Sequence, residues 1–273
     1  MPAKPNEIVL TRVYDAPLSL MWEVWTEQAH LERWWGPRGF TITTKHKEIA
    51  PGGKWIFAMH GPDGADYPNQ ITYHEVVPFE RLVYDHGTDE ARPKAFSMVV
   101  TFAEAKGKTT VCIAMAVATP EAAREMAKHI KRANGTSTWD RLGEYLEHKA
   151  TGAEVLLVTR SFATDAKTLF AMWHAPADVA KWLPRGGAIT ASDAGEGGSA
   201  RWSITTPAGT IALQSTATFA AEGGDAARVT LRCAIAGEVT AAAREAFSAQ
   251  KRFMNEAWND AFDQLDVLLA PRS

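Results

Sequence analysis

The sequence contains two diverged copies of one pattern, and this feature constrains the fold more than any single motif does. The segment VLTRVYDAPLSLMWEVW near the N-terminus matches LVTRSFATDAKTLFAMW in the second half, so that Trp25 corresponds to Trp173. Further matches follow in the same order, namely RWWGPRG with KWLPRG, Gly52-Gly53 with Gly197-Gly198, and Trp139 with Trp258. Ordered internal repetition indicates consecutive domains of one architecture. We therefore predict two tandem domains, residues 1–150 and 151–273.

The length and composition agree with this division. At roughly one domain per 100 to 200 residues, a chain of 273 residues is expected to form two domains. Hydrophobic residues make up 46% of the chain and charged residues 22%, which is typical of a globular protein and not of a disordered one. The formal net charge is only −3, so no nucleic-acid or anionic-lipid partner is predicted. A basic cluster at Lys128, His129, Lys131 and Arg132 is expected to be a solvated helix face.

Neither a secretion signal nor a membrane span is predicted. The N-terminal segment MPAKPNEIVLTRVY has no apolar stretch of signal-peptide length, and a run of about 18 apolar residues does not occur. The two cysteines, Cys112 and Cys233, lie in different halves of the chain and imply no disulfide framework. We therefore expect a cytoplasmic protein.

The two copies differ in length at one place. Gly64 and Phe102 are 38 positions apart, whereas their counterparts Gly209 and Phe219 are 10 apart. The difference of 28 residues corresponds to about residues 71–96, which in the first copy read as two strands, ITYHEVV and RLVYDH. Because two consecutive antiparallel strands return the chain to its original direction, a sheet without them can still close. We expect the second copy to form a smaller sheet.

Hydrophobic spacing predicts the same order of elements in each copy. Each copy opens with a strand, at residues 7–14 and 154–162, and continues with a helix. In the first copy a shorter helical stretch with Leu31, Trp34 and Trp35 follows. Later strands are predicted at residues 97–102 and 109–117 in the first copy, and at 214–219 and 228–235 in the second. Each copy ends in a helix of about 25 residues, although Asn134-Gly135 predicts a kink or a break in the first.

A cavity is predicted between the sheet and the final helix of the first copy. In the strand KWIFAMH, alternation places Trp55, Phe57 and Met59 on one face. A sheet of about six or seven strands leaves space on its concave side when one helix packs across only one end, and such a space suits an apolar molecule. The residues expected to line it are Trp35, Trp55, Phe57, Met59, Tyr84, Met98, Trp139 and Leu142.

An ordered set of motifs in residues 1–148 resembles a known family. The motifs are TRVYDAPLSLMWEVWTEQAHLERWWGPRGF, PGGKWIFAMHGPDG, HEVVPFERLVY and a final Trp-x-x-Leu-x-x-Tyr-Leu pattern. Together they are similar to the bacterial homologues of the activator of Hsp90 ATPase, the AHSA1-like group of the START-like or SRPBCC superfamily. The second copy is similar but departs from the pattern by lacking two central strands.

The resemblance implies an α+β helix-grip fold of β-α-α-β6-α order, in which a curved antiparallel sheet surrounds a long C-terminal helix. It also implies a pocket between the sheet and that helix. The superfamily includes lipid and hormone carriers, polyketide cyclases and toxin-sequestering proteins. The resemblance therefore implies a fold and does not imply one chemistry.

No catalytic motif is present, since the chain has no His-Glu-x-x-His, phosphate-binding loop, Gly-x-Ser-x-Gly or Cys-x-x-Cys sequence. A single acid or base in the cavity would nevertheless suffice for a cyclase, and His60, Tyr73 and His86 are the candidates. His60, His74 and His86 lie on neighbouring predicted strands, but alternation turns His60 away from the Trp55 face. We therefore predict no metal site and no cofactor.

The ten tryptophans are a further notable feature. The Trp34-Trp35 pair beside a Gly-Pro turn could form a hydrophobic lid, whereas most of the others are expected to lie in the core. The expected core tryptophans are Trp22, Trp25, Trp139, Trp173, Trp182 and Trp258.

Three functions remain open. In the first, the first domain binds a small apolar or aromatic molecule, and the second domain is a structural or regulatory companion. In the second, the protein is a cyclase-like acid/base enzyme that acts on a polyketide or aromatic substrate. In the third, it is a protein-interaction or co-chaperone-like stress-response module that contacts a chaperone through an outer face. We rank ligand binding first, and the sequence leaves the oligomeric state open.

Overall fold

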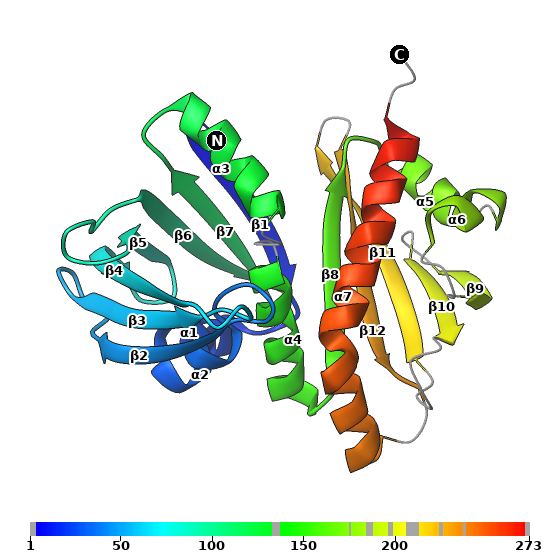
Figure 1. The fold of residues 1–273 in the computed structure, drawn as a ribbon, viewed down its shortest axis with the longest axis horizontal. Helices are drawn as coiled ribbons and strands as arrows, with labels where there is room; N and C mark the ends of the chain where they lie inside the picture. The colour runs from blue at the N-terminus through cyan, green and yellow to red at the C-terminus, as the bar shows by residue number, and fades with distance from the viewer. Residues whose placement is uncertain are drawn as a thin grey trace. The chain divides into compact units, whose positions relative to one another are not determined.

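The computed structural model describes residues 4–132, 137–174, 176–183, 188–195, 199–205, 213–223, 226–236 and 239–270. The chain divides into two compact units, Met1–Thr151 and Gly152–Ser273, and each unit contains one antiparallel sheet with helices (Figure 1). Several positions named in the sequence predictions lie outside the described residues, namely Asn134, Gly135, residues 184–187, Gly197, Gly198 and Gly209. No helix among the described residues is long and apolar enough to cross a membrane.

The first unit is α+β. Its elements, in chain order, are β1 (Glu7–Tyr14), α1 (Leu18–Thr26), α2 (Gln28–Trp34), β2 (Thr41–Lys47), β3 (Lys54–His60), β4 (Asp66–Val77), β5 (Arg81–Gly87), β6 (Phe96–Ala105), β7 (Lys108–Ala116), α3 (Pro120–Arg132) and α4 (Ser137–Thr151). The strands form a seven-stranded sheet in the order β1-β7-β6-β5-β4-β3-β2, with every neighbouring pair antiparallel. Only β1 is out of sequence order, because it pairs with the last strand.

The second unit has a smaller sheet. Its elements are β8 (Val155–Phe162), α5 (Ala166–His174), α6 (Pro176–Trp182), β9 (Ala188–Gly195), β10 (Ser199–Thr205), β11 (Leu213–Gly223), β12 (Ala226–Ile235) and α7 (Ala241–Leu269). The order of the five strands is β8-β12-β11-β10-β9. Here β10 pairs directly with β11, which pairs with the last strand, β12. In the first unit, by contrast, β4 and β5 lie between β3 and β6.

The helical end of the first copy, predicted as one helix with a kink or a break at Asn134-Gly135, consists of two helices in the described residues. The structure has two helices there, α3 and α4, on either side of residues 133–136. The second unit has a single 29-residue helix, α7. The sequences explain the difference, because Asn-Gly is a poor helix interior and a glycine alone costs about 1 kcal/mol relative to alanine. The sequence of α7 contains no glycine or proline.

A stacked tryptophan pair joins the first helix to the last in each unit. The rings of Trp25 and Trp139 lie 6.0 Å apart at an interplanar angle of 11°. The rings of Trp173 and Trp258 lie 6.2 Å apart at 8°. In both units the strand phenylalanine meets the first-helix tryptophan edge-on at 5.4 Å, at 81° for Phe102 and at 80° for its counterpart. The two cores are therefore built on the same aromatic arrangement.

A second shared contact fixes the turn between the two short helices of each unit. The indole Nε1 of Trp34 donates a hydrogen bond to the carbonyl of Val24 at 2.9 Å. The indole Nε1 of Trp182 donates to the carbonyl of Met172 at 3.3 Å. Each bond spans ten residues, so the indole ties the end of the second helix back to the first.

The final helices pack differently in the two units. In the second unit α7 contacts the strands β8 and β12, and its inward side chains Phe247, Phe262 and Leu265 are fully buried. In the first unit α4 mainly contacts the helices α1 and α2, while α3 contacts β1. The last strand of the first sheet, β7, therefore receives less cover from α4 than the last strand of the second sheet, β12, receives from α7.

Candidate functional site

The inner face of the first sheet is defined by its register. Directly opposed residues of antiparallel strands project to the same side, so the face that carries Trp55 can be followed across the sheet. The pairs Phe57–Asn69, Ile71–His86, His86–Phe96, Tyr84–Met98 and Met98–Met115 continue it from β3 to β7. The inner-face residues in the middle of these strands are Trp55, Phe57, Met59, Tyr67, Asn69, Ile71, Tyr73, Leu82, Tyr84, His86, Phe96, Met98, Val100, Phe102, Val111, Ile113 and Met115.

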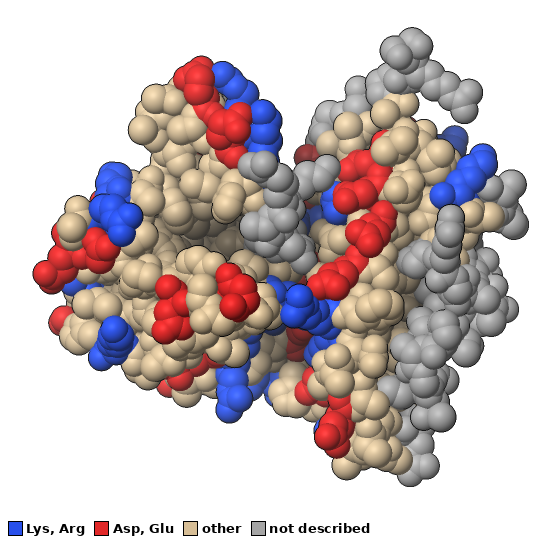
Figure 2. All heavy atoms as spheres, viewed as in Figure 1, with Lys and Arg blue, Asp and Glu red and all other residues tan. Residues whose placement is uncertain are grey.

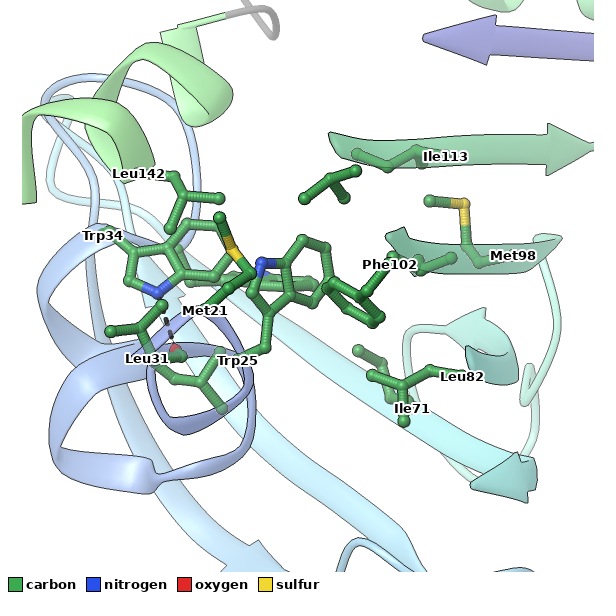
Figure 3. Close-up of a cluster of buried hydrophobic side chains, with 14 of the residues drawn as sticks. Met21, Trp25, Leu31, Trp34, Ile71, Leu82, Met98, Phe102, Ile113 and Leu142 are labelled. Atoms are coloured by element: carbon green, nitrogen blue, oxygen red, sulfur yellow. Dashed lines mark hydrogen bonds between the residues drawn. The ribbon is translucent and has the colours of Figure 1, made fainter. Parts of the chain in front are cut away.

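One end of this face is closed by aromatic packing against the helices. Trp55 and Phe57 stack with ring centroids 4.1 Å apart, and Trp35 meets Trp55 edge-on at 5.0 Å. Trp35, Trp55 and Leu142 are buried within the core cluster. Figure 3 shows Trp25, Trp34 and Leu142 gathered at the helical end, with Met98 and Ile113 farther along the strands.

The lid prediction for the tryptophan pair is wrong. Trp34 is fully buried and Trp35 is 8% exposed, so neither side chain forms a movable cover over the surface. Both rings are held in the aromatic cluster with Trp25. The physical reason is that the indole of Trp34 is fixed by its bond to the Val24 carbonyl.

The other end of the inner face is open. His86, Phe96 and Met115 point to the inner side but remain only half-buried. Met59 is also half-buried, but it lies against the Gly36 turn. Figure 2 shows the first unit hollowed on this side, below α3 and over the strands that Figure 1 labels β6 and β7. Tyr84 and Met98 lie between this hollow and the closed aromatic end, because the register places them in the middle of the same face.

His86 and Asn69 form a polar pair on this apolar face. His86 Nε2 lies 2.9 Å from Asn69 Oδ1. The imidazole is surrounded by rings, since Phe96 lies at 4.9 Å and Phe57 at 6.3 Å between centroids. Burial lowers the pKa of His86 from 6.5 to about 4. The side chain is therefore a neutral hydrogen-bonding group near pH 7.

Tyr73 and Tyr84 are two further titratable groups on this face. Both are buried, and their rings meet edge-on at 5.7 Å. Burial raises the pKa of each phenol, so both hydroxyls stay protonated. The Tyr84 hydroxyl is buried and bonds to no described residue. It is an unpaired donor, which costs free energy unless a partner is supplied.

His60 and His74, the other two histidines considered as candidates, lie on the outer, solvent-facing side of the sheet. His60 Nδ1 lies 2.7 Å from Asp66 and its Nε2 lies 2.9 Å from Thr43 Oγ1. His74 is 52% exposed and pairs with Asp85 at 2.9 Å. The structure therefore brings His86 to the inner face and leaves the other two away from it. No group of three or more His, Cys, Asp or Glu side chains that could hold a metal occurs among the described residues.

Arg141 holds the Trp-Trp-Gly-Pro turn against α4, a contact that the sequence analysis did not predict. Its Nη1 donates to the carbonyls of Gly36 at 2.8 Å and Pro37 at 2.9 Å. Longer bonds at 3.1 to 3.3 Å reach the carbonyls of Arg33, Trp35 and Phe40. The acceptors are backbone carbonyls, which every residue carries, so the sequence gives no signal for which arginine will bind them.

An ion pair fixes the same turn from its other side. Arg38 forms a bidentate bond to Glu144, with distances of 2.6 and 3.1 Å. Both side chains are about nine-tenths buried, at 9% and 10% exposure. Together with Arg141, this pair holds the turn next to the closed aromatic end of the inner face. The closed end is therefore fixed by buried polar contacts as well as by aromatic packing.

The half-buried imidazole of His86 predicts a pH dependence of stability. Because the pKa of His86 is lowered on folding, the unfolded chain binds a proton at a higher pH than the folded protein does. This contribution is complete above about pH 6.5 and is lost as the pH falls toward 4. From pH 7.5 to pH 5, we expect the free energy of unfolding to fall by about 2 kcal/mol less in His86→Phe than in the unchanged protein. Urea denaturation at both pH values measures this, and equal falls would contradict it.

The family comparison identifies the first unit. Residues 15–147 match the family model described as activator of Hsp90 ATPase homolog 1-like protein. These residues form an AHSA1-like SRPBCC domain with the seven-stranded sheet and helices of the helix-grip fold. The match ends at residue 147, before the second unit begins. A search of curated proteins found no match.

Several solved structures are similar to the chain. A protein from Mycobacterium smegmatis has a TM-score of 0.49 and 22% identity, covering 54% of this chain and 96% of its own. An AHSA1 protein from Silicibacter pomeroyi has a TM-score of 0.43 and 19% identity, covering 52% and 99%. DynU16, from the dynemicin biosynthetic locus, has a TM-score of 0.38 and 12% identity, covering 96% and 98%. The family assignment rests on the family model.

Proposed function

We propose that the first unit binds a small hydrophobic or aromatic molecule at the open end of its inner face. The observation that carries this proposal is that the apolar inner-face side chains Phe96 and Met115 remain half-buried on β6 and β7, the strands over which the first unit is hollowed (Figure 2). A ligand that removes the remaining apolar surface of these side chains from water is stabilised in its complex by roughly 25 cal/mol per Å² of surface buried. Concave apolar surfaces with a few polar groups are the usual small-molecule sites.

The titratable groups of the inner face favour binding over acid/base catalysis. A general base works best when its pKa lies near the operating pH. Burial instead lowers the pKa of His86 to about 4 and raises the pKa of the Tyr73 and Tyr84 phenols. At neutral pH the imidazole is a poor base and the phenols are poor acids, so these groups are suited to hydrogen bonding with a neutral ligand.

We also propose that the second unit is a shortened copy of the first and that its role is structural. The shared stacked tryptophans, the edge-on phenylalanines and the indole-to-carbonyl bonds support a common origin. Small or apolar side chains such as Ala217, Ala227 and Leu231 are fully buried on its sheet. Because α7 packs directly on β8 and β12, this part of the second unit is a filled core.

A cavity-filling substitution tests the proposed ligand site. We expect Met115→Trp in the full-length protein to weaken binding of an apolar probe, naphthalene, by about a hundredfold, because the indole would occupy the ligand's space. Isothermal titration calorimetry measures the affinity. Val99→Trp is the matched control, because Val99 is 37% exposed and pairs with Ala114 on the outer face of the sheet.

Thermal unfolding of both variants separates a filled site from a damaged fold. The proposal holds when Met115→Trp remains folded and loses binding while Val99→Trp keeps it. Equal affinity in Met115→Trp and the unchanged protein would place the ligand elsewhere. Failure of the unchanged protein to bind naphthalene would remove the support for an apolar site.

A further inference from the structure

We infer that the ligand of the first unit is a neutral aromatic molecule with a hydroxyl group that donates a hydrogen bond to His86 Nδ1. This inference rests on the proposed function and names the chemical class of the ligand. It is carried by the polar pair of His86 and Asn69 on an inner face that is otherwise largely apolar and aromatic.

The hydrogen bonds of Asn69 set the tautomer of His86. Asn69 Nδ2 donates to the carbonyl of Tyr67 at 2.9 Å, which orients the amide so that Oδ1 faces the imidazole. An amide oxygen only accepts hydrogen bonds, so His86 Nε2 must carry the proton. In a neutral imidazole the other nitrogen then holds a lone pair. Asn69 therefore acts as a positioning residue that makes Nδ1 an acceptor.

This acceptor is open among the described residues. The structure places no described donor within hydrogen-bond distance of His86 Nδ1, and the side chain is only half-buried. Its surroundings on the inner face are Phe96 and Phe57. A hydroxyl group on an aromatic ring would satisfy the acceptor while the ring packs against these side chains.

The charge pattern of the five central strands favours a neutral ligand, because the cations of this face, Arg12 opposite Val111 and Lys47 opposite Trp55, lie on the two edge strands. The inner-face positions from Trp55 to Met59, Tyr67 to Tyr73, Leu82 to His86, Phe96 to Phe102 and Val111 to Met115 carry no lysine, arginine, aspartate or glutamate. An anion or cation placed among them would lose its hydration without gaining a counter-charge. The unpaired Tyr84 hydroxyl, two residues along β5 on the same face, supplies a donor for a second neutral oxygen of the ligand.

Three naphthalene derivatives test the inference on the full-length protein. 2-Naphthol carries a donor, 2-methoxynaphthalene has the same oxygen without a donor, and 2-naphthoate is an anion. We expect 2-naphthol to bind about tenfold more tightly than 2-methoxynaphthalene, which is the size of one hydrogen bond, and 2-naphthoate to bind most weakly. Isothermal titration calorimetry at pH 7 measures the three affinities.

Two variants locate the preference at the proposed atom. His86→Phe keeps an aromatic ring but removes the acceptor, so we expect it to bind both uncharged probes with the tenfold difference abolished. Asn69→Ala leaves His86 in place but removes the acceptor that keeps the proton on Nε2, so both neutral tautomers of the imidazole become populated. For this variant we expect a reduced preference for 2-naphthol, together with a change in the ¹⁵N chemical shifts of the His86 ring that reports mixed tautomers.

The outcomes distinguish this inference from the proposed function. If 2-naphthol and 2-methoxynaphthalene bind the unchanged protein equally, the hydroxyl inference is overturned while the apolar site stands. A tenfold preference that survives in His86→Phe also overturns the hydroxyl inference, because a group other than His86 then accepts the hydrogen bond from the hydroxyl. Tightest binding of 2-naphthoate contradicts a neutral ligand, and binding of none of the three contradicts both proposals.

Discussion

Replacing Trp25 with alanine is expected to lower the free energy of unfolding of the first unit by about 3 to 5 kcal/mol, the usual cost of removing a buried tryptophan. Trp25 is 2% exposed, stacks on Trp139 and meets Phe102 edge-on. The indole thus joins the first helix, the last helix and the sheet. Its loss leaves a cavity at the point where these three elements meet.

The proposed duplication supplies a matched variant, Trp173→Ala. Trp173 is 1% exposed and stacks on Trp258 in the same way, so we expect a similar loss confined to the second unit. Hydrogen exchange followed by mass spectrometry assigns each effect to residues 1–151 or 152–273. Trp25→Phe is the milder control, because the Trp25 Nε1 bonds to no described residue and an aromatic ring is retained. A loss below about 1 kcal/mol in Trp25→Ala would show that this ring does not hold the core together.

Replacing Arg141 with alanine is expected to lower the free energy of unfolding by about 3 to 4 kcal/mol, because several turn carbonyls would lose a charged donor. The guanidinium bonds most closely to the carbonyls of Gly36 and Pro37. Gly36 has a φ of +90°, and a β-carbon there would lie 2.8 Å from Met59 Cε, so the turn has little freedom to find other partners. Chemical denaturation of the full-length variant measures the loss.

Arg141→Lys separates the charge from the geometry. Lysine keeps the positive charge but lacks the planar fork that reaches several carbonyls at once, so we expect it to recover less than half of the stability. Full recovery would show that the charge alone matters, and an unchanged stability in Arg141→Ala would show that water satisfies the turn.

Local patterns in the sequence were sufficient for most of the elements. The first strand spans Glu7–Tyr14 as predicted, and β6 and β7 contain or closely match the predicted ranges 97–102 and 109–117. The alternation of KWIFAMH correctly separates Trp55 and Phe57 from His60. These features depend on neighbours in the chain, for which the two-residue period of a strand is a direct signal.

The break between α3 and α4 shows the limit of such patterns. Asn134-Gly135 predicts a kink or break, but the apolar spacing on both sides also fits one continuous helix. Which helix covers which strands depends on packing between distant segments. The structure decides that α4 contacts α1 and α2, and this choice leaves the half-buried face over β6 and β7.

The sequence by itself determined that each half would form strands, a first helix and a helical end, because those choices follow from local spacing of apolar residues and from turn residues. Tertiary structure alone decided that His86 meets Asn69 and that Arg141 meets the Gly36 turn, 105 residues away along the chain. The register between strands and the docking of α4 bring these groups together. A hydrogen bond between distant residues leaves no periodic trace in the chain, so it becomes visible only when the partners are folded against each other.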